Sequence, residues 1–171
     1  MVDARRMLSN LTDALGRATR RAAGRAREGA EKAAARAGER VRGREEAPLL
    51  DLARVDADEA LFLVRVMIAS SAADGVVDDA ERDRLQGAMR DAGLDPTDRA
   101  FLDDEISWPR DIEEIADAVD TPEKAERAYA AARLVIEPDT MQEREFLRLL
   151  AERMDLTAEQ VSRVEARAGG I

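Results

Sequence analysis

The chain has 171 residues, which is enough for one compact domain with an extension but not for two large cores. Aromatic residues are scarce, and alanine, leucine, arginine and glutamate dominate, so the composition favours helices over strands. Cysteine and histidine are absent, which excludes disulfides, thiol nucleophiles, the commonest general base and most zinc sites.

Charge divides the chain into two unlike parts. Residues 1–44 contain 12 basic and 5 acidic residues, whereas residues 45–171 contain 15 basic and 32 acidic residues. We predict a basic arm over residues 1–44, a linker over residues 45–57 that contains Pro48, and an acidic helical domain over residues 58–168. Leu49, Leu50 and Leu52 of the linker are candidates for docking back onto the domain.

The basic arm begins with a predicted amphipathic helix, because apolar residues recur there at spacings of three and four. Such a helix can lie on an anionic membrane surface. The candidate membrane-contact residues are Arg5, Arg6, Met7, Leu8, Leu11 and Leu15. No run approaches the roughly 20 apolar residues that cross a bilayer, and nothing resembles a signal peptide. We therefore expect a cytoplasmic protein, peripheral at the inner membrane face.

The rest of the arm, residues 17–44, allows three interpretations. Alanine, arginine, glutamate and glycine dominate it, so it has little apolar surface to bury and fits a partly disordered tether. Its positive charge also fits a membrane surface or a nucleic acid. The arm contains no aromatic residue on which a base could stack, which disfavours nucleic acid.

The acidic domain shows signals for seven helices. Residues 61–68 are apolar on nearly all sides and predict a central buried helix, and the small residues 69–73 predict a close approach by another helix. Six further helix starts follow from capping residues and prolines. These starts are Asp78 with Glu81, Asp95-Pro96, the turn at Trp108-Pro109, Thr121-Pro122, Thr140 with Glu143, and Thr157 with Gln160. The predicted fold is an all-α compact bundle, with Trp108 buried under its turn or, alternatively, exposed as a partner contact.

Two portions of the domain look like a degenerate two-fold repeat. A buried helix that ends in "AADG" leads to a capped helix, and a second one that ends in "IEPDT" leads to another. If the two buried helices are antiparallel, the two acidic turns lie at opposite ends of the domain. If they are parallel, the turns converge and up to seven carboxylates meet. These are Asp74, Asp78, Asp79, Glu81, Glu137, Asp139 and Glu143.

These carboxylates have three explanations. Ca²⁺ or Mg²⁺ could bind there, because both ions prefer oxygen ligands. The candidate metal ligands are Asp74, Asp78, Glu81, Asp139 and Glu143. The first turn is not an EF-hand loop, since Gly75 directly follows the first acid. Alternatively, the acids only cap helix N-termini, or they form an acidic patch that binds a protein.

The stretch from Leu61 to Arg163, with "ASSAADGVVDDAER" and "IEPDTMQEREFLRLLAERMDL", resembles the TerB-like helical domains named for tellurite resistance. It looks most like the uncharacterised bacterial proteins of the YebE type, many of which are regarded as inner-membrane associated. The opening "DARRMLSNL" is also similar to their amphipathic start, although an Arg/Ala run replaces their usual glycine-rich apolar segment. The resemblance implies a compact bundle and a candidate divalent-cation site, and it implies no established activity.

We do not expect an enzyme. A site built from carboxylates alone suits glycoside chemistry, but that chemistry needs aromatic sugar platforms and the chain has few aromatic residues. The expected function is a non-catalytic interaction or stress-response module with protein partners and no small-molecule substrate. The alternatives are a sensor of Ca²⁺ or Mg²⁺ and, less favoured, a nucleic-acid accessory protein that acts through its basic arm.

Overall fold

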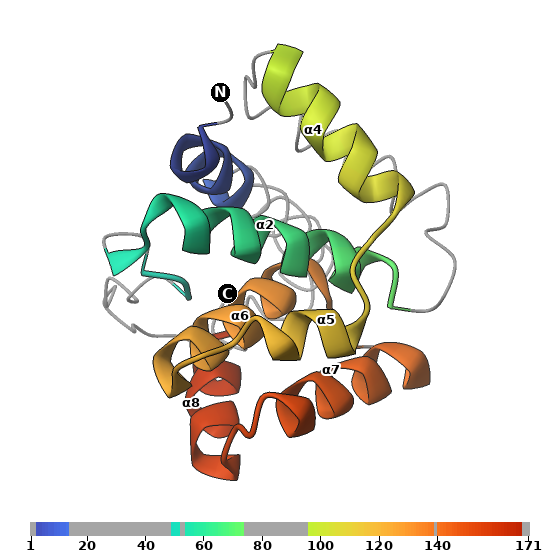
Figure 1. The fold of residues 1–171 in the computed structure, drawn as a ribbon. Coiled ribbons are helices and arrows are strands. Elements are labelled where there is room, and N and C mark those ends of the chain that lie inside the picture. Colours follow the sequence, from blue (N-terminus) through green and yellow to red (C-terminus); the bar gives the residue numbers. More distant parts are fainter. Residues whose placement is uncertain (1–2, 14–48, 52–53, 74–95, 139, 169–171) are drawn as a thin grey trace, which may run out of the picture.

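The computed structural model describes residues 3–13, 49–51, 54–73, 96–138 and 140–168 (Figure 1). Residues 4–13 are helical and are called the N-terminal segment below. The helices that follow are α2 (Ala57–Ser71), α4 (Pro96–Ser107), α5 (Ile112–Asp117), α6 (Pro122–Val135), α7 (Met141–Arg153) and α8 (Ala158–Ala168). The described residues contain no strand, so the all-α prediction is confirmed. The predicted helix that starts at Asp78 lies outside the described residues.

Helix α2 forms the centre of the bundle, as the sequence predicts. It crosses the middle of the molecule in Figure 1, and nine of its fifteen residues are buried. Its main packing partner is α6, which buries Tyr129 and five alanines. Small side chains such as these alanines let two helices approach closely.

Helices α2 and α6 both run from left to right in Figure 1. Arg127 Nε lies 2.6 Å from Glu59 Oε1, and Lys124 Nζ lies 5.1 Å from the centre of the Phe62 ring. The two contacts follow opposite orders along the two helices, so the helices cross near their N-terminal halves. The convergence of the two acidic turns stays a prediction, because Asp74, Asp78 and Asp139 lie outside the described residues.

The predicted capping residues at Thr121, Thr140 and Thr157 are confirmed. Thr121 and Thr140 each accept a hydrogen bond from the backbone N–H three residues on, and Thr157 does the same with Gln160. Two more N-caps, Asp56 before α2 and Asp111 before α5, were not predicted from the sequence. Each such cap stabilises its helix by about 1 kcal/mol.

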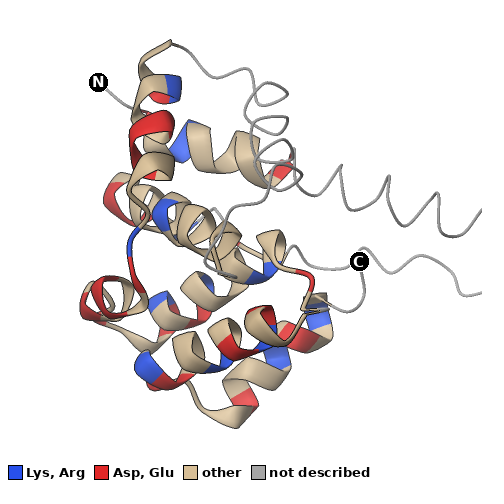
Figure 2. Ribbon diagram, turned by 90° about the vertical axis from the view of Figure 1, so that its right-hand side faces the viewer, with Lys and Arg blue, Asp and Glu red and all other residues tan. Residues whose placement is uncertain are grey.

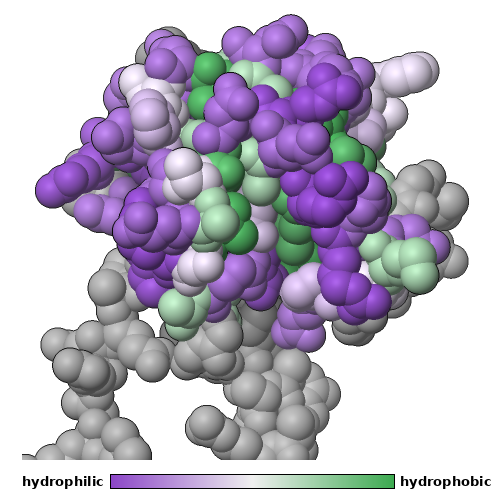
Figure 3. All heavy atoms as spheres, turned by 90° about the horizontal axis from the view of Figure 1, so that it is seen from below, coloured by the Kyte–Doolittle hydropathy of each residue, from purple (hydrophilic) through white to green (hydrophobic). Residues whose placement is uncertain are grey.

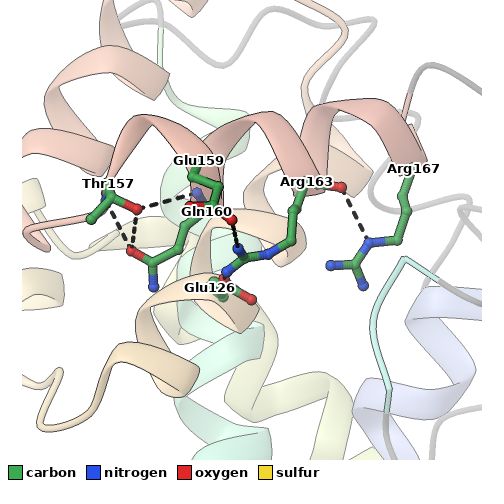
Figure 4. A network of polar contacts seen from close by, with 6 residues as sticks. All are labelled: Glu126, Thr157, Glu159, Gln160, Arg163 and Arg167. Carbon is green, nitrogen blue, oxygen red and sulfur yellow. Dashed lines mark hydrogen bonds and ion pairs between the residues drawn. The ribbon is translucent and has the colours of Figure 1, made fainter.

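Polar contacts fix α8 against α6. The Tyr129 hydroxyl donates to Glu165 Oε1 at 2.7 Å, and Arg133 Nε donates to the same oxygen at 2.9 Å. Burial and the hydrogen bond to Glu165 both raise the pKa of Tyr129 above its ordinary value. Figure 4 shows the more exposed side of this contact, where Arg163 of α8 pairs with Glu159 on its own helix and with Glu126 of α6.

The N-terminal segment belongs to the same hydrophobic core as the acidic domain. Ala4, Met7, Leu8 and Leu11 are at most 5% exposed and lie in one cluster with the apolar residues of α2 and α6. Leu49 and Leu50 are buried in that cluster too, which confirms that they dock back, whereas Leu52 lies outside the described residues. The division between a basic arm (1–44) and a helical domain (58–168) therefore needs correction for residues 4–11, because their apolar face packs into the domain.

A buried charge also ties this segment to α4. The Asp98 side chain is fully buried and lies 2.9 Å from Arg6 Nη2, and its other oxygen accepts a bond of 3.3 Å from the Asp3 backbone N–H. A buried carboxylate requires such partners, because burying it unpaired costs several kcal/mol. Arg6 therefore positions the N-terminal segment on the domain.

Candidate functional site

Of the five candidate metal ligands, the structure describes only Glu143. Its carboxylate closes a capping box, accepting a hydrogen bond of 3.0 Å from the Thr140 backbone and one of 2.8 Å from the Thr140 hydroxyl. Asp74, Asp78, Glu81 and Asp139 lie outside the described residues, as does Asp79. Within the part of the chain that is described, no three acidic side chains come close enough together to hold a metal ion. Glu143 thus has the capping role, and the metal site stays a prediction.

The candidate membrane-contact residues are arranged differently from the prediction. Met7, Leu8 and Leu11 face the protein core rather than the surface, because α2, α6 and their neighbours supply the apolar surroundings that a membrane was expected to provide. Arg6 pairs with Asp98, Arg5 is exposed, and Leu15 lies outside the described residues. Among the described helices, none combines the length and the apolar character that a membrane crossing requires.

Trp108 is the most exposed large hydrophobic residue of the described chain, with 81% of its surface accessible. The prediction that it fills the core under its turn is therefore wrong. Its backbone N–H donates to the Asp104 carbonyl at 3.2 Å, so the helical pattern of α4 continues through it and Pro109 then redirects the chain. This geometry leaves the indole on the outside of the turn rather than beneath it.

A shallow hollow of about 340 Å³ lies beside this turn. Its apolar lining comes from three parts of the chain, namely the end of α2 (Ala69 and Ala72), the turn and start of α5 (Pro109 and Ile112), and Phe146 of α7. Arg110, Asp111 and Glu113 complete the lining. We call Trp108 together with Pro109, Ile112 and Phe146 the Trp108 surface.

Several helix ends meet on this side of the molecule. Figure 1 shows the end of α2, the α4–α5 connection and the starts of α5 and α7 along its right-hand edge. Met141, the other exposed large hydrophobic residue among those described, is the first residue of α7 and is 76% exposed. On the face seen from below in Figure 3, hydrophobic residues form strips between hydrophilic ones.

The charges next to the Trp108 surface are partly paired. Arg110 lies 3.1 Å from Glu114 and 3.9 Å from Glu105, and Glu105 also binds Arg65 at 2.8 Å. Arg153 reaches Glu113 at 3.1 Å. Figure 2 looks onto this side and shows acidic positions on several helices around the connection. The surface thus combines apolar area with hydrogen-bonding charges, as protein-binding surfaces do.

The chain matches the family described as "Protein of unknown function (DUF533)" over residues 7–168. It belongs to this family. DUF533 is a TerB-like family, so the resemblance drawn from the acidic turns and capped helices is confirmed at that level. The match includes the N-terminal segment from Met7 onward, which agrees with its place in the core. No curated protein and no solved structure matches the chain significantly.

Two features of the structure were not predicted from the sequence. The capping box at Asp111 has the pattern of an acid followed by glutamate three residues on, and that pattern was available in the sequence. The buried pair of Arg6 and Asp98 had no such signal, because the two residues are 92 positions apart and each one resembles an ordinary surface charge.

Proposed function

We propose that this DUF533 protein is a non-catalytic interaction module whose contact surface is the Trp108 surface. The observation that carries the proposal is the exposure of Trp108 beside the apolar hollow. Tryptophan is the residue type most enriched at the energetic centres of protein interfaces. An indole that is 81% exposed contributes little to folding, and together with the apolar hollow beside it the indole offers a contact area for a partner.

The geometry of the hollow supports a protein partner over a small substrate. Walls from α2, α5 and α7 make it shallow and open, whereas small-molecule sites bury most of their ligand. An apolar side chain of a partner could enter it while the indole packs alongside. A stress-response role, the closeness to YebE-type proteins and a role in tellurite resistance are parts of this proposal that rest on the sequence resemblance alone.

The test is affinity purification from cells that naturally produce the protein. The full chain is compared with Trp108→Ala and with Glu159→Ala, a matched change at a glutamate of α8 whose side chain is 85% exposed. We expect a partner that is recovered with the parent chain and with Glu159→Ala, and that is lost with Trp108→Ala because a hot-spot residue contributes about 2 kcal/mol or more. Recovery of the same partners with Trp108→Ala would refute the proposal, provided that all three proteins show the same thermal unfolding.

A second candidate function is a sensor of Ca²⁺ or Mg²⁺. Figure 1 shows α2 and α6 both ending on its right-hand side, and in the sequence each of the two helices is followed by an acidic segment. Binding to the folded state would raise stability by about 2.7 kcal/mol at a metal concentration one hundred times the Kd. Thermal melts in CaCl₂, MgCl₂ and NaCl of matched ionic strength, on the parent chain and on the double variant Asp74→Asn with Asp139→Asn, test it. Identical curves in all three salts would exclude this function.

We also propose peripheral membrane association, by a mechanism that differs from the predicted insertion of an apolar helix face. Since Met7, Leu8 and Leu11 are committed to the core, attachment would depend on the basic residues of the arm rather than on an inserted apolar face. Sedimentation with anionic vesicles at two salt concentrations measures this, and charge-dominated binding should disappear at the higher one.

A further inference from the structure

The C-terminal end of α4 carries acidic residues where a helix prefers basic ones. Asp103 and Asp104 are exposed within five residues of its last residue, Ser107, and the last turn contains no basic residue. A carboxylate in the last turn of a helix, such as that of Asp104, is disfavoured by about 0.3 to 1 kcal/mol, because that end already carries partial negative charge. Stability alone therefore does not explain why it is there.

These two carboxylates also differ from their neighbour Glu105. Glu105 is held by Arg65 and approached by Arg110, whereas Asp103 and Asp104 have no ion pair or side-chain hydrogen bond with any other part of the described structure. Departures from local rules that nothing nearby compensates are concentrated at functional sites. A cation from another molecule would offset the negative charge of Asp103 and Asp104 near the end of α4.

The exposed indole lies one helical turn beyond Asp104. The hydrogen bond from the Trp108 N–H to the Asp104 carbonyl continues the helix, so the two side chains leave it on the same face. Tryptophan attracts cations over its ring more strongly than other aromatic residues do. A carboxylate and an indole side by side can hold the head group of an arginine or lysine while its stem packs on the ring.

We propose that the Trp108 surface binds a cationic segment of a partner protein, one in which arginine or lysine residues accompany an apolar side chain. This inference rests on the proposed function and names the chemical class of the partner. The cationic head lies between Asp104 and Trp108, and the apolar side chain enters the hollow between Pro109, Ile112 and Phe146. The net charge of −17 over residues 45–171, from 15 basic and 32 acidic residues, attracts such a segment from a distance.

The test uses the full chain and three synthetic peptides. All three share the same leucines, and the remaining positions are arginine, glutamine or glutamate. Because Trp108 is the only tryptophan, its fluorescence reports binding at this surface directly. We expect the arginine peptide to shift the Trp108 emission to shorter wavelength and to bind at least about tenfold more tightly than the other two, with an affinity that falls as NaCl is added.

Two variants locate the binding. Asp104→Asn should weaken the arginine peptide about threefold, whereas Glu123→Gln, a matched change at an exposed acid of α6, should not. Trp108→Ala should weaken it about tenfold in calorimetry, a readout that does not need the indole. Equal effects of Asp104→Asn and Glu123→Gln would show general charge attraction and overturn the inference.

The remaining outcomes separate the two proposals. Trp108-dependent binding of all three peptides with equal affinity would keep the contact surface and overturn the cationic class. If no peptide binds in a Trp108-dependent way, this inference is overturned, while the contact surface is judged by the affinity purification. An emission shift that depends on protein concentration without any peptide would identify a second copy of the chain as the occupant and overturn the partner assignment.

Discussion

The N-terminal segment and the α4–α5 connection use their apolar residues in opposite ways. Met7, Leu8 and Leu11 are almost completely inaccessible, although they belong to a basic helix near the start of the chain. Trp108 is 81% exposed, although it is the largest apolar side chain in the protein. The difference teaches that burial follows from the neighbours that the fold provides. The N-terminal segment shares its apolar face with the core, whereas among the described residues no element covers the Trp108 indole.

The strongest challenge to this comparison is removal of a buried leucine from the N-terminal segment. Leu8→Ala should lower the free energy of unfolding by about 3 kcal/mol, because it deletes buried methyl groups and leaves a cavity. Urea unfolding followed by circular dichroism measures the effect, with the exposed Arg5→Ala as the matched control. Equal midpoints for the two variants would mean that the segment is not part of the core.

The buried ion pair gives the next largest expected effect. Arg6→Ala should destabilise the protein by about 2 kcal/mol, because it leaves the fully buried Asp98 carboxylate with fewer hydrogen-bond partners. The same unfolding experiment applies. An effect no larger than that of Arg5→Ala would contradict the tie between the segment and α4.

Tyr129, the single tyrosine, is buried, whereas Trp108, the single tryptophan, is exposed. Tyr129 is buried and bonded to Glu165, so Tyr129→Phe should cost about 1 kcal/mol. Its raised pKa also stabilises the folded state at pH values below the unfolded value of about 10, and this contribution is lost as the pH rises beyond it. Tyrosinate absorbance should therefore appear only when the folded chain unfolds in alkali. Its appearance near pH 10 in a folded chain would show that Tyr129 is accessible.

The smallest expected effect belongs to the exposed indole. Trp108→Ala should change the free energy of unfolding by less than about 0.5 kcal/mol, since little of the side chain is buried on folding. The pair of Leu8→Ala and Trp108→Ala thus makes the comparison quantitative. A loss of several kcal/mol in Trp108→Ala would place the indole in the core.

Much of the fold could be predicted from local signals. Thr121, Thr140 and Thr157 start helices because a side-chain oxygen next to free backbone N–H groups is a local interaction. The central place of α2 followed from its apolar residues on all sides.

The predictions that were wrong concern features that depend on distant parts of the chain. The apolar stripe of Met7, Leu8 and Leu11 predicts that one helix face is covered, and it does not say whether lipid or protein covers it. Trp108-Pro109 predicts a turn, and it does not fix the side on which the indole emerges. The packing of α6 on α2 includes the pair of Glu59 and Arg127, two residues 68 positions apart, whose pairing no local pattern reveals.

The most direct test of the central claim, that the Trp108 surface is a contact surface, is acrylamide quenching of Trp108 fluorescence. The measurement is made on the folded chain alone, on the urea-unfolded chain, and on the complex with the partner recovered by affinity purification. We predict that quenching of the free folded chain approaches that of the unfolded chain, because the indole is 81% exposed, and that the partner protects it strongly. Protection in the free chain, or equal quenching with and without the partner, would contradict the account.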